Sequence, residues 1–235
     1  MKLEPLKIKR RIMEIGLKTG CSHVASAMSC VNLLCDIYNK WPNEIIVLSK
    51  AHGALALYVI LNEFGKLPDE ILDTYYQDGG LSVHATLDRD HGIYASCGSL
   101  GHGLGIGVGY ALANPKSPVI VVLSDGELDE GSTMEAFKII KKLRIKNILP
   151  IVDRNDCQGF DKCVGYLEPS FREYYSIKGE GWGDLEGKFE SHYKTVNRGL
   201  YDLWSQNSAA IEQNREKTIK EFNSLKKKNG KDKNR

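Results

Sequence analysis

The chain has 235 residues, of which 42% are hydrophobic and 26% are charged, and this ordinary globular composition excludes a disordered, collagen-like or coiled-coil protein. The 32 basic and 30 acidic side chains leave a net charge of +2, which indicates no strongly acidic or basic partner. No apolar run approaches the length of a membrane span, and the first residues lack the apolar core of a signal peptide. We therefore expect a soluble, cytoplasmic protein with no membrane contact.

The first part of the chain predicts helices on either side of a short strand. Residues 22–38 have the apolar periodicity of a helix, with His23 at its start. Residues 44–49 are apolar and rich in β-branched side chains, which predicts a strand, and a second helix is expected to follow it to about residue 64. Residues 79–98 contain four glycines and no sustained period, which predicts a long loop of the kind that often carries function.

The middle of the chain predicts a glycine-rich helix and two more strands. Five alternate glycines mark the apolar segment up to residue 113, and their cost of about 1 kcal/mol each in a helix favours close approach of another backbone, helix or ligand. Residues 118–124 are typical of a fully buried parallel strand, and a helix is expected at 133–143. Residues 147–153 predict a further strand, in which Pro150 removes a ladder hydrogen bond and favours an edge or irregular position.

Strands that alternate with helices predict an α/β fold with a doubly wound, mainly parallel sheet flanked by helices. We expect a single domain over residues 1–204, whose last helix covers 193–204, and then a C-terminal helix and a basic, disordered tail over 205–235. The charge run at 226–235 is typical of a solvated terminus, so no nucleic-acid binding is expected. The six cysteines have no CxxC spacing and are expected to be reduced thiols.

Function in such sheets lies in the loops at the carboxyl ends of the strands, which here are residues 49–53, 124–131 and 153–161. Asp125 supplies a carboxylate in the second of these loops, and Asn155 supplies an amide oxygen in the third, 30 residues later. A carboxylate and an amide oxygen at this spacing, after two successive apolar strands, form a specific pattern.

Simpler interpretations of two motifs stay open. An Asp-Gly pair after a strand is commonly only a turn, so Asp125 with Gly126 is not by itself a functional signal. Ser132 and Glu135 have the spacing of a capping box, which would satisfy backbone amides at a helix start and would make Glu135 a pure cap.

The stretch 124–136, together with Asn155, resembles the thiamine diphosphate motif of transketolases. In that family the diphosphate is held through Mg²⁺, next to a helix N-terminus that favours anions. The resemblance implies that Mg²⁺ binds Asp125, Asn155 and the backbone carbonyl of Cys157, and that the cofactor also contacts Gly126 and Glu127.

Two further segments resemble cofactor-binding segments of the same family. Residues 49–53 are similar to a segment whose histidine contacts the diphosphate and the reacting centre, and this histidine is His52 here. Residues 97–103 are similar to a segment whose backbone groups hold the aminopyrimidine ring. The residues that the resemblance assigns to this role are Gly98, Ser99 and Leu100.

Three more residues match family positions with catalytic roles. His84 resembles a histidine that hydrogen-bonds the ketol oxygens of the substrate, and His23 resembles one near the transferred carbon unit. Glu130 matches a glutamate of an acidic, water-linked cluster between the two active sites of a dimer. By the resemblance, the catalytic residues of this chain are thus His23, His52, His84 and Glu130.

The resemblance covers residues 15–187, the diphosphate-binding domain of a transketolase, and implies the thiamine diphosphate-binding fold. The pyrimidine-binding domain, whose glutamate activates the cofactor, is absent from this sequence. We therefore interpret the chain as the N-terminal subunit of a split transketolase that depends on thiamine diphosphate and Mg²⁺ and transfers a two-carbon ketol unit between sugars or sugar phosphates. The expected partner is the C-terminal subunit with the pyrimidine-binding domain, in a heterotetramer.

Three alternative functions stay open at this point. The first is a subunit similar to deoxyxylulose-phosphate synthase, and the second is a subunit similar to a 2-oxo acid dehydrogenase. The third is a noncatalytic subunit that keeps the fold. The Glu130-Gly131 and Glu135-Ala136 pairs, with residues 49–53, favour transketolase over the first two. The presence of both metal ligands and of the matching histidines argues against loss of activity.

Overall fold

A computed structural model describes residues 2–155, 172–175, 195–206 and 208, and the structural statements below concern these residues. The helices are α1 (Pro5–Thr19), α2 (Val24–Lys40), α3 (Ala54–Glu63), α4 (Asp69–Leu72), α5 (Gly103–Ala113) and α6 (Gly131–Leu143), with one more at 198–206. The strands are β1 (Ile45–Leu48), β2 (Val119–Ser124), β3 (Ile148–Arg154) and β4 (Arg172–Tyr175). Two short 3-10 turns, η1 (Ala51–Gly53) and η2 (Gly126–Asp129), follow β1 and β2.

The described strands form one parallel sheet in the order β1-β2-β3-β4. In the register of β2 and β3, Val119 lies opposite Ile148 and Ser124 lies opposite Asp153. The residues that follow these two strands therefore leave the sheet at the same edge, as the carboxyl ends of parallel strands do.

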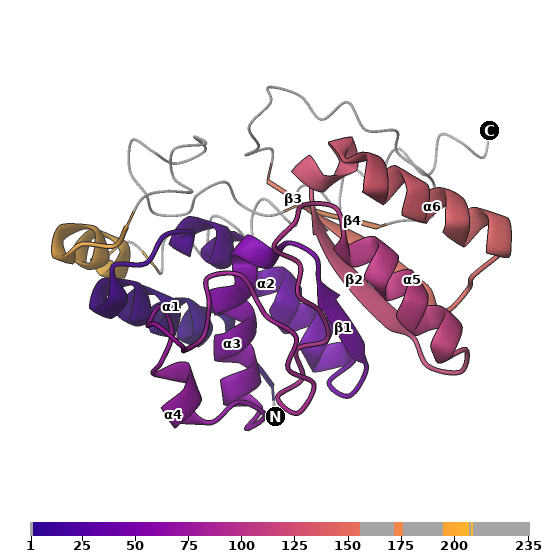
Figure 1. Ribbon diagram of the computed structural model, residues 1–235. Coiled ribbons are helices and arrows are strands. Elements are labelled where there is room, and N and C mark those ends of the chain that lie inside the picture. The colour runs from indigo at the N-terminus through magenta and orange to yellow at the C-terminus, as the bar shows by residue number, and fades with distance from the viewer. Residues whose placement is uncertain (1, 156–171, 176–194, 207, 209–235) are drawn as a thin grey trace, which may run out of the picture.

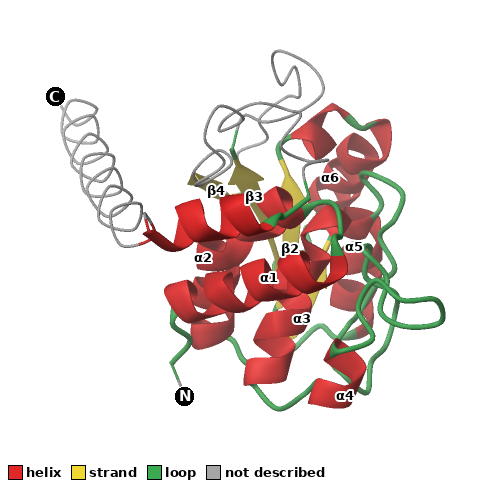
Figure 2. Cartoon of the chain, turned by 90° about the vertical axis from the view of Figure 1, so that its left-hand side faces the viewer, coloured by secondary structure: helices red, strands yellow, loops and turns green. Residues whose placement is uncertain are grey.

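Helices cover both faces of the sheet, as Figures 1 and 2 show, with α1, α2 and α3 on one side and α5 and α6 on the other. Successive side chains of β2 alternate between two cores because a strand has a period of two. Ile120 and Val122 pack under α1, α2 and α3, whereas Val121 and Leu123 pack under α5 and α6. The predicted α/β fold with a parallel sheet flanked by helices is confirmed.

The predicted strands and most predicted helices occur at the expected places. β3 is not an edge strand, but Pro150, for which the sequence favours an edge or irregular position, is paired on one side only among the described residues. β3 lies between β2 and β4 in the sheet. Proline is tolerated there because pairing with β4 begins only at Ile151, one residue after Pro150. At Pro150 the strand has a described neighbour only on the side of β2, where Val121 lies opposite.

Two of the four glycines of α5 are required by close packing. A Cβ atom on Gly103 would collide with the side chain of Ser49, and one on Gly107 would collide with the side chain of Val121. The predicted close approach of another backbone is therefore confirmed at these two positions. Because Gly103 and Gly107 have no side chain, α5 lies directly on the sheet and against the loop that follows β1.

The capping box expected at the start of α6 is wrong. The helix begins at Gly131 with Glu130 as its N-cap, and no side chain caps it. Ser132 therefore lies inside the first turn, and Glu135 is an exposed residue in the body of the helix.

The described C-terminal part of the chain packs against α1. Residues 195–197 have no regular structure and a helix covers 198–206, whereas the sequence predicted a helix over 193–204. Val196 lies against Gly16, and Trp204 is buried in the core under α1, α2 and α3. None of the described helices is both long and apolar enough to cross a membrane. The expected tail lies outside the described residues, and the domain boundary at residue 204 stays a prediction.

Candidate functional site

The predicted metal ligands lie at the carboxyl ends of β2 and β3. Asp125 directly follows β2, and Asn155 directly follows β3. Both side chains are buried, with 5% of Asp125 and 6% of Asn155 exposed, so each is withdrawn from bulk water. The parallel register, which pairs Ser124 with Asp153, places these two residues at the same edge of the sheet. Cys157, the third predicted ligand, lies outside the described residues.

The oxygen atoms of Asp125 and Asn155 suit a hard cation that takes most of its ligands from a bound cofactor and from water. Asp125 offers a carboxylate, whose Oδ1 accepts the backbone N–H of Gly126 at 3.0 Å. Among the described residues, no group of three His, Cys, Asp or Glu side chains is placed to hold a metal ion. Mg²⁺ usually takes only one or two protein carboxylates and completes its octahedron with phosphate oxygens and water. A carboxylate and an amide oxygen therefore fit Mg²⁺ with a diphosphate.

A buried ion pair lies beside the predicted metal ligands. The Lys50 ammonium lies 2.5 Å from Oδ2 of Asp153, and the two side chains are 1% and 0% exposed. Burial by itself lowers the pKa of Lys50, but the charge of Asp153, then Cys30, the hydrogen bond to Asp153 and Asp125 outweigh it and raise this pKa. Lys50 is therefore a permanent cation at the centre of the site.

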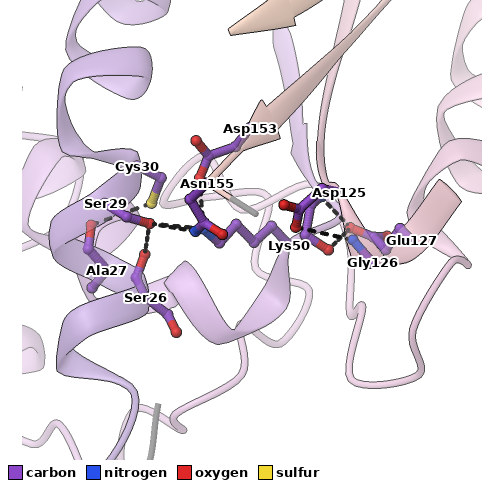
Figure 3. Close-up of polar contacts among 11 residues, drawn as sticks. Ser26, Ala27, Ser29, Cys30, Lys50, Asp125, Gly126, Glu127, Asp153 and Asn155 are labelled. Carbon is purple, nitrogen blue, oxygen red and sulfur yellow. Dashed lines mark hydrogen bonds and ion pairs between the residues drawn. The ribbon is translucent and has the colours of Figure 1, made fainter. Parts of the chain in front are cut away.

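Ser29 of α2 connects this ion pair to Asn155. Lys50 Nζ donates a hydrogen bond to Ser29 Oγ at 2.9 Å, and Asn155 Nδ2 donates one to the same oxygen at 3.3 Å. Ser29 in turn donates to the carbonyl oxygen of Ser26 at 3.0 Å. Figure 3 shows Lys50 and Asn155 converging on Ser29 from the loop after β1 and from the end of β3.

Glu127 connects three segments of the chain, which contain Ser49, Gly101 and Ser124, through hydrogen bonds. Its side chain is 0% exposed. Oε1 accepts hydrogen bonds from the Ser49 hydroxyl and from the N–H of Gly101 at 3.2 Å. Oε2 accepts the N–H of Ser124 at 2.7 Å and its hydroxyl at 3.1 Å. Burial raises the pKa of this carboxyl, and the hydrogen bonds from Ser49, Ser124 and Gly101 oppose that shift.

The loop expected to hold the aminopyrimidine ring is anchored through Gly101. Gly98, Ser99 and Leu100 are exposed and directly precede this glycine. Gly101 has a φ of +79°, and a Cβ atom there would lie 2.6 Å from Cβ of Glu130. Glycine is thus needed both for the left-handed backbone and for contact with the start of α6.

Three of the predicted histidines converge, although they come from distant segments. The ring of His23 lies 5.9 Å from that of His52 and 5.6 Å from that of His84, measured between centroids. His52 lies in η1 after β1, and His84 lies in the long loop over 79–98. His23 adopts a left-handed backbone with a φ of +63° at the start of α2, which is unfavourable for a side chain of this kind. We call His23, His52 and His84 the histidine cluster.

The sequence interpretation missed Ser29, Lys50 and Asp153. Lys50 stands directly after an apolar strand, where a lysine must be exposed or paired, and this was the available signal. Its partner Asp153 lies 103 positions later and is recognisable only once the strands are known to be close.

Replacing Glu127 by glutamine is expected to lower the free energy of unfolding by about 1–3 kcal/mol. In either orientation of the new amide, its NH₂ group replaces an acceptor and faces the backbone N–H of Gly101 or of Ser124, so one hydrogen bond is lost. Urea denaturation followed by circular dichroism measures this change. Glu135→Gln, at an exposed position of α6, is the control and should leave stability unchanged. Equal midpoints for Glu127→Gln and the unmodified chain would show that these four hydrogen bonds do not hold the loops.

A family model matches nearly the whole chain, and curated relatives match most of it. The family model described as 1-deoxy-D-xylulose-5-phosphate synthase matches residues 4–227. Over 204 residues the chain is 35% identical to a subunit of apulose-4-phosphate transketolase from Phocaeicola vulgatus, with 79% of this chain and 71% of the relative covered. Over 179 residues it is 34% identical to the 6-deoxy-6-sulfo-D-fructose transketolase subunit SqwG of a Clostridium species, with 68% of this chain and 65% of that relative covered.

A solved structure has the same fold as this chain. The transketolase from Campylobacter jejuni subsp. jejuni superposes with a TM-score of 0.73 over 87% of this chain, at 17% sequence identity. The superposition covers 42% of the solved chain. The sequence described here therefore spans less than half of that protein.

Proposed function

This chain belongs to the transketolase family, as a relative of its separate N-terminal subunits, and we propose that it is the diphosphate-binding half of a two-chain transketolase. In this proposal the assembled enzyme uses thiamine diphosphate and Mg²⁺ to transfer a two-carbon ketol unit between sugars or sugar phosphates. The observation that carries the proposal is the placement of Asp125 and Asn155, both buried, at the carboxyl ends of adjacent parallel strands.

The residues around this edge have distinct roles towards the cofactor. Asp125, Asn155 and the backbone carbonyl of Cys157 hold Mg²⁺, and the N–H of Gly126 anchors Oδ1 of Asp125. The exposed residues Gly98, Ser99 and Leu100 receive the aminopyrimidine ring. When bound, thiamine diphosphate supplies the nucleophilic carbon that accepts the transferred unit.

Glu127 takes a different role from the direct cofactor contact that the sequence resemblance implies. All four of its described hydrogen bonds go to Ser49, Gly101 and Ser124. We assign it to holding the loops that carry His52, Leu100 and Asp125 in place. This arrangement pre-organises the cofactor site, because the loops need not be ordered when the cofactor binds.

The histidine cluster is suited to the oxygen atoms of a ketol substrate. An imidazole donates and accepts protons near neutral pH, and its N–H groups stabilise negative charge on oxygen. His23, His52 and His84 are half-buried, so they are partly shielded from water but can reach a substrate. We assign them to hydrogen bonding of the substrate oxygens and to proton transfer during bond cleavage and formation.

The proposed partner is a C-terminal subunit that carries the pyrimidine-binding domain. Two relatives are named as transketolase subunits, which supports a two-chain enzyme. In the proposed heterotetramer, Glu130 at the start of α6 belongs to an acidic cluster between the two active sites.

The cytoplasm is the proposed location. The six cysteines, which have no CxxC spacing, support a reducing compartment.

A second candidate function is that of a subunit similar to 1-deoxy-D-xylulose-5-phosphate synthase, because the family model of that description matches residues 4–227. The two candidates differ in the substrates of the assembled enzyme. A synthase joins pyruvate to an aldehyde with loss of CO₂, whereas a transketolase transfers a ketol unit between two sugars. Transketolase is favoured because the chain matches 71% of the length of the Phocaeicola vulgatus transketolase subunit.

Reconstitution tests the proposed function. The full chain is co-expressed with a chain that contains a pyrimidine-binding domain, and the purified complex is assayed for ketol transfer with and without Mg²⁺ and thiamine diphosphate. Suitable donors include apulose-4-phosphate and 6-deoxy-6-sulfo-D-fructose, after the names of two relatives. Cofactor-dependent ketol transfer is expected. Release of CO₂ from pyruvate without ketol transfer would favour the second candidate, and a complex that binds no cofactor would contradict both.

Substituting His52 by alanine is expected to lower kcat of the reconstituted complex by about 100-fold or more, as removal of a proton-transfer group does. The melting temperature should change little, because His52 is half-buried and lies outside the cores. His91→Ala is the control, since His91 bonds Asp88 at 2.6 Å in the long loop and has no proposed role. An unchanged kcat would remove His52 from the mechanism.

A further inference from the structure

We propose that Lys50 and Ser29 are positioning residues that determine which end of the Asn155 amide faces the metal. The inference rests on the proposed function, in which Asn155 gives its amide oxygen to Mg²⁺. An asparagine amide has one oxygen that accepts and one nitrogen that donates. Only the oxygen binds Mg²⁺, so a rotation of the amide by half a turn removes the ligand without moving the backbone.

The three side chains meet inside the protein, where water does not compete for their hydrogen bonds. Lys50, Ser29 and Asn155 are all less than 10% exposed. Ser29 Oγ lies 2.9 Å from Lys50 Nζ and 3.3 Å from Asn155 Nδ2. The Ser29 hydroxyl also lies 3.0 Å from the carbonyl oxygen of Ser26 (Figure 3).

The hydrogen bonds that the structure places here define one arrangement of hydrogen atoms. A lysine ammonium only donates, so Ser29 Oγ must accept from Lys50. The single hydroxyl hydrogen of Ser29 is used by the carbonyl oxygen of Ser26, which only accepts. With its hydrogen directed to the carbonyl oxygen of Ser26, Ser29 accepts from Asn155. Asn155 must present its NH₂ group to Ser29, and its oxygen is then directed away from Ser29.

The ion pair keeps this arrangement from relaxing. The Lys50 ammonium is held by Asp153 at 2.5 Å, and both partners are inaccessible to water. Lys50 therefore cannot leave Ser29 for solvent without leaving Asp153 as an unpaired buried charge, which is costly. The orientation of the Asn155 amide is thus fixed before any metal binds, and no free energy of metal binding is spent on turning it.

Ser29→Ala tests the inference because it removes the acceptor with little change in volume. The measured quantity is the dissociation constant of Mg²⁺ at saturating thiamine diphosphate, determined by calorimetry on the full chain with its companion chain. We expect binding about 10-fold weaker, which is typical when a partner of a metal ligand is lost. Ser26→Ala is the matched control, since Ser26 lies on the same helix and its buried hydroxyl has no hydrogen-bond partner among the described residues.

Asn155→Asp separates amide orientation from a general loosening of the site. A carboxylate has two oxygen atoms, so half a turn leaves it unchanged as a ligand. In the Asn155→Asp background, Ser29→Ala should therefore change Mg²⁺ affinity by much less than 10-fold. An equal loss in both backgrounds, or a similar loss in Ser26→Ala, would overturn the inference.

The failure of the inference is distinguishable from the failure of the proposed function. If the unmodified complex binds Mg²⁺ with thiamine diphosphate and Ser29→Ala binds equally well, the orienting role of Ser29 and Lys50 is wrong and the proposed function stands. If the unmodified complex shows no Mg²⁺-dependent binding of the cofactor, the proposed function fails and the inference fails with it.

Discussion

Replacing Lys50 by methionine is expected to lower the free energy of unfolding by about 3–5 kcal/mol, because it leaves the fully buried Asp153 carboxylate without its counter-ion. Methionine has nearly the volume of lysine but no charge, so the change is electrostatic rather than a loss of packing. The free energy of unfolding is measured by urea denaturation. The raised pKa of Lys50 means that this stabilisation is fully present below the usual lysine pKa of 10.5 and is lost as the pH rises through the folded-state value.

Two controls define the origin of this loss. The double variant Lys50→Met with Asp153→Leu removes both charges and should recover most of the stability, as apolar replacements of buried ion pairs do. Lys7→Met breaks the ion pair with Glu63, in which the lysine side chain is 64% exposed, and should cost less than about 1 kcal/mol. A Lys50→Met variant as stable as Lys7→Met would contradict the importance of the buried pair.

Replacing Asp125 by alanine is expected to weaken the Mg²⁺-dependent binding of thiamine diphosphate by more than about 100-fold, beyond the range typical for residues that only support a ligand. The carboxylate is the one charged ligand in the proposed set, and the N–H of Gly126 holds its Oδ1 at the end of β2. Calorimetric titration of the cofactor in Mg²⁺ and in a chelator measures the change.

Glu135→Ala is the control for Asp125→Ala, because Glu135 is an exposed carboxylate in α6 and lies outside the proposed site. It should leave cofactor affinity unchanged. Retention of tight, Mg²⁺-dependent binding by Asp125→Ala would show that the metal has other ligands.

The fold was predictable where the strands are buried on both faces. Such strands are continuous apolar runs, and residues 118–124 and 147–153 were recognised for this reason. Helix α1 was not predicted, although Ile8, Ile12 and Ile15 have helical spacing, because basic residues interrupt the pattern. Pro150 is paired on one side only, as an edge or irregular position requires, but the sequence does not show that a second strand begins to pair one residue later.

The site residues that match a family motif were predictable from the sequence. The residues that hold them in place through hydrogen bonds were not. Asp125, Asn155 and His52 stand in recognisable segments, and their binding roles stay predictions. The hydrogen bond between Ser29 and Asn155 joins residues 126 positions apart, and the one between Ser49 and Glu127 joins residues 78 apart. Contacts at such distances follow from strand order and helix packing, which a single sequence does not specify.

A crystal structure of the complex with its companion chain, thiamine diphosphate and Mg²⁺ tests the account most directly. The account predicts one metal ion within about 2.0–2.1 Å of a carboxylate oxygen of Asp125 and of the amide oxygen of Asn155, with the cofactor diphosphate bound to the same ion. A metal ion held elsewhere, or the side chains of Asp125 and Asn155 turned away from a bound cofactor, would contradict it.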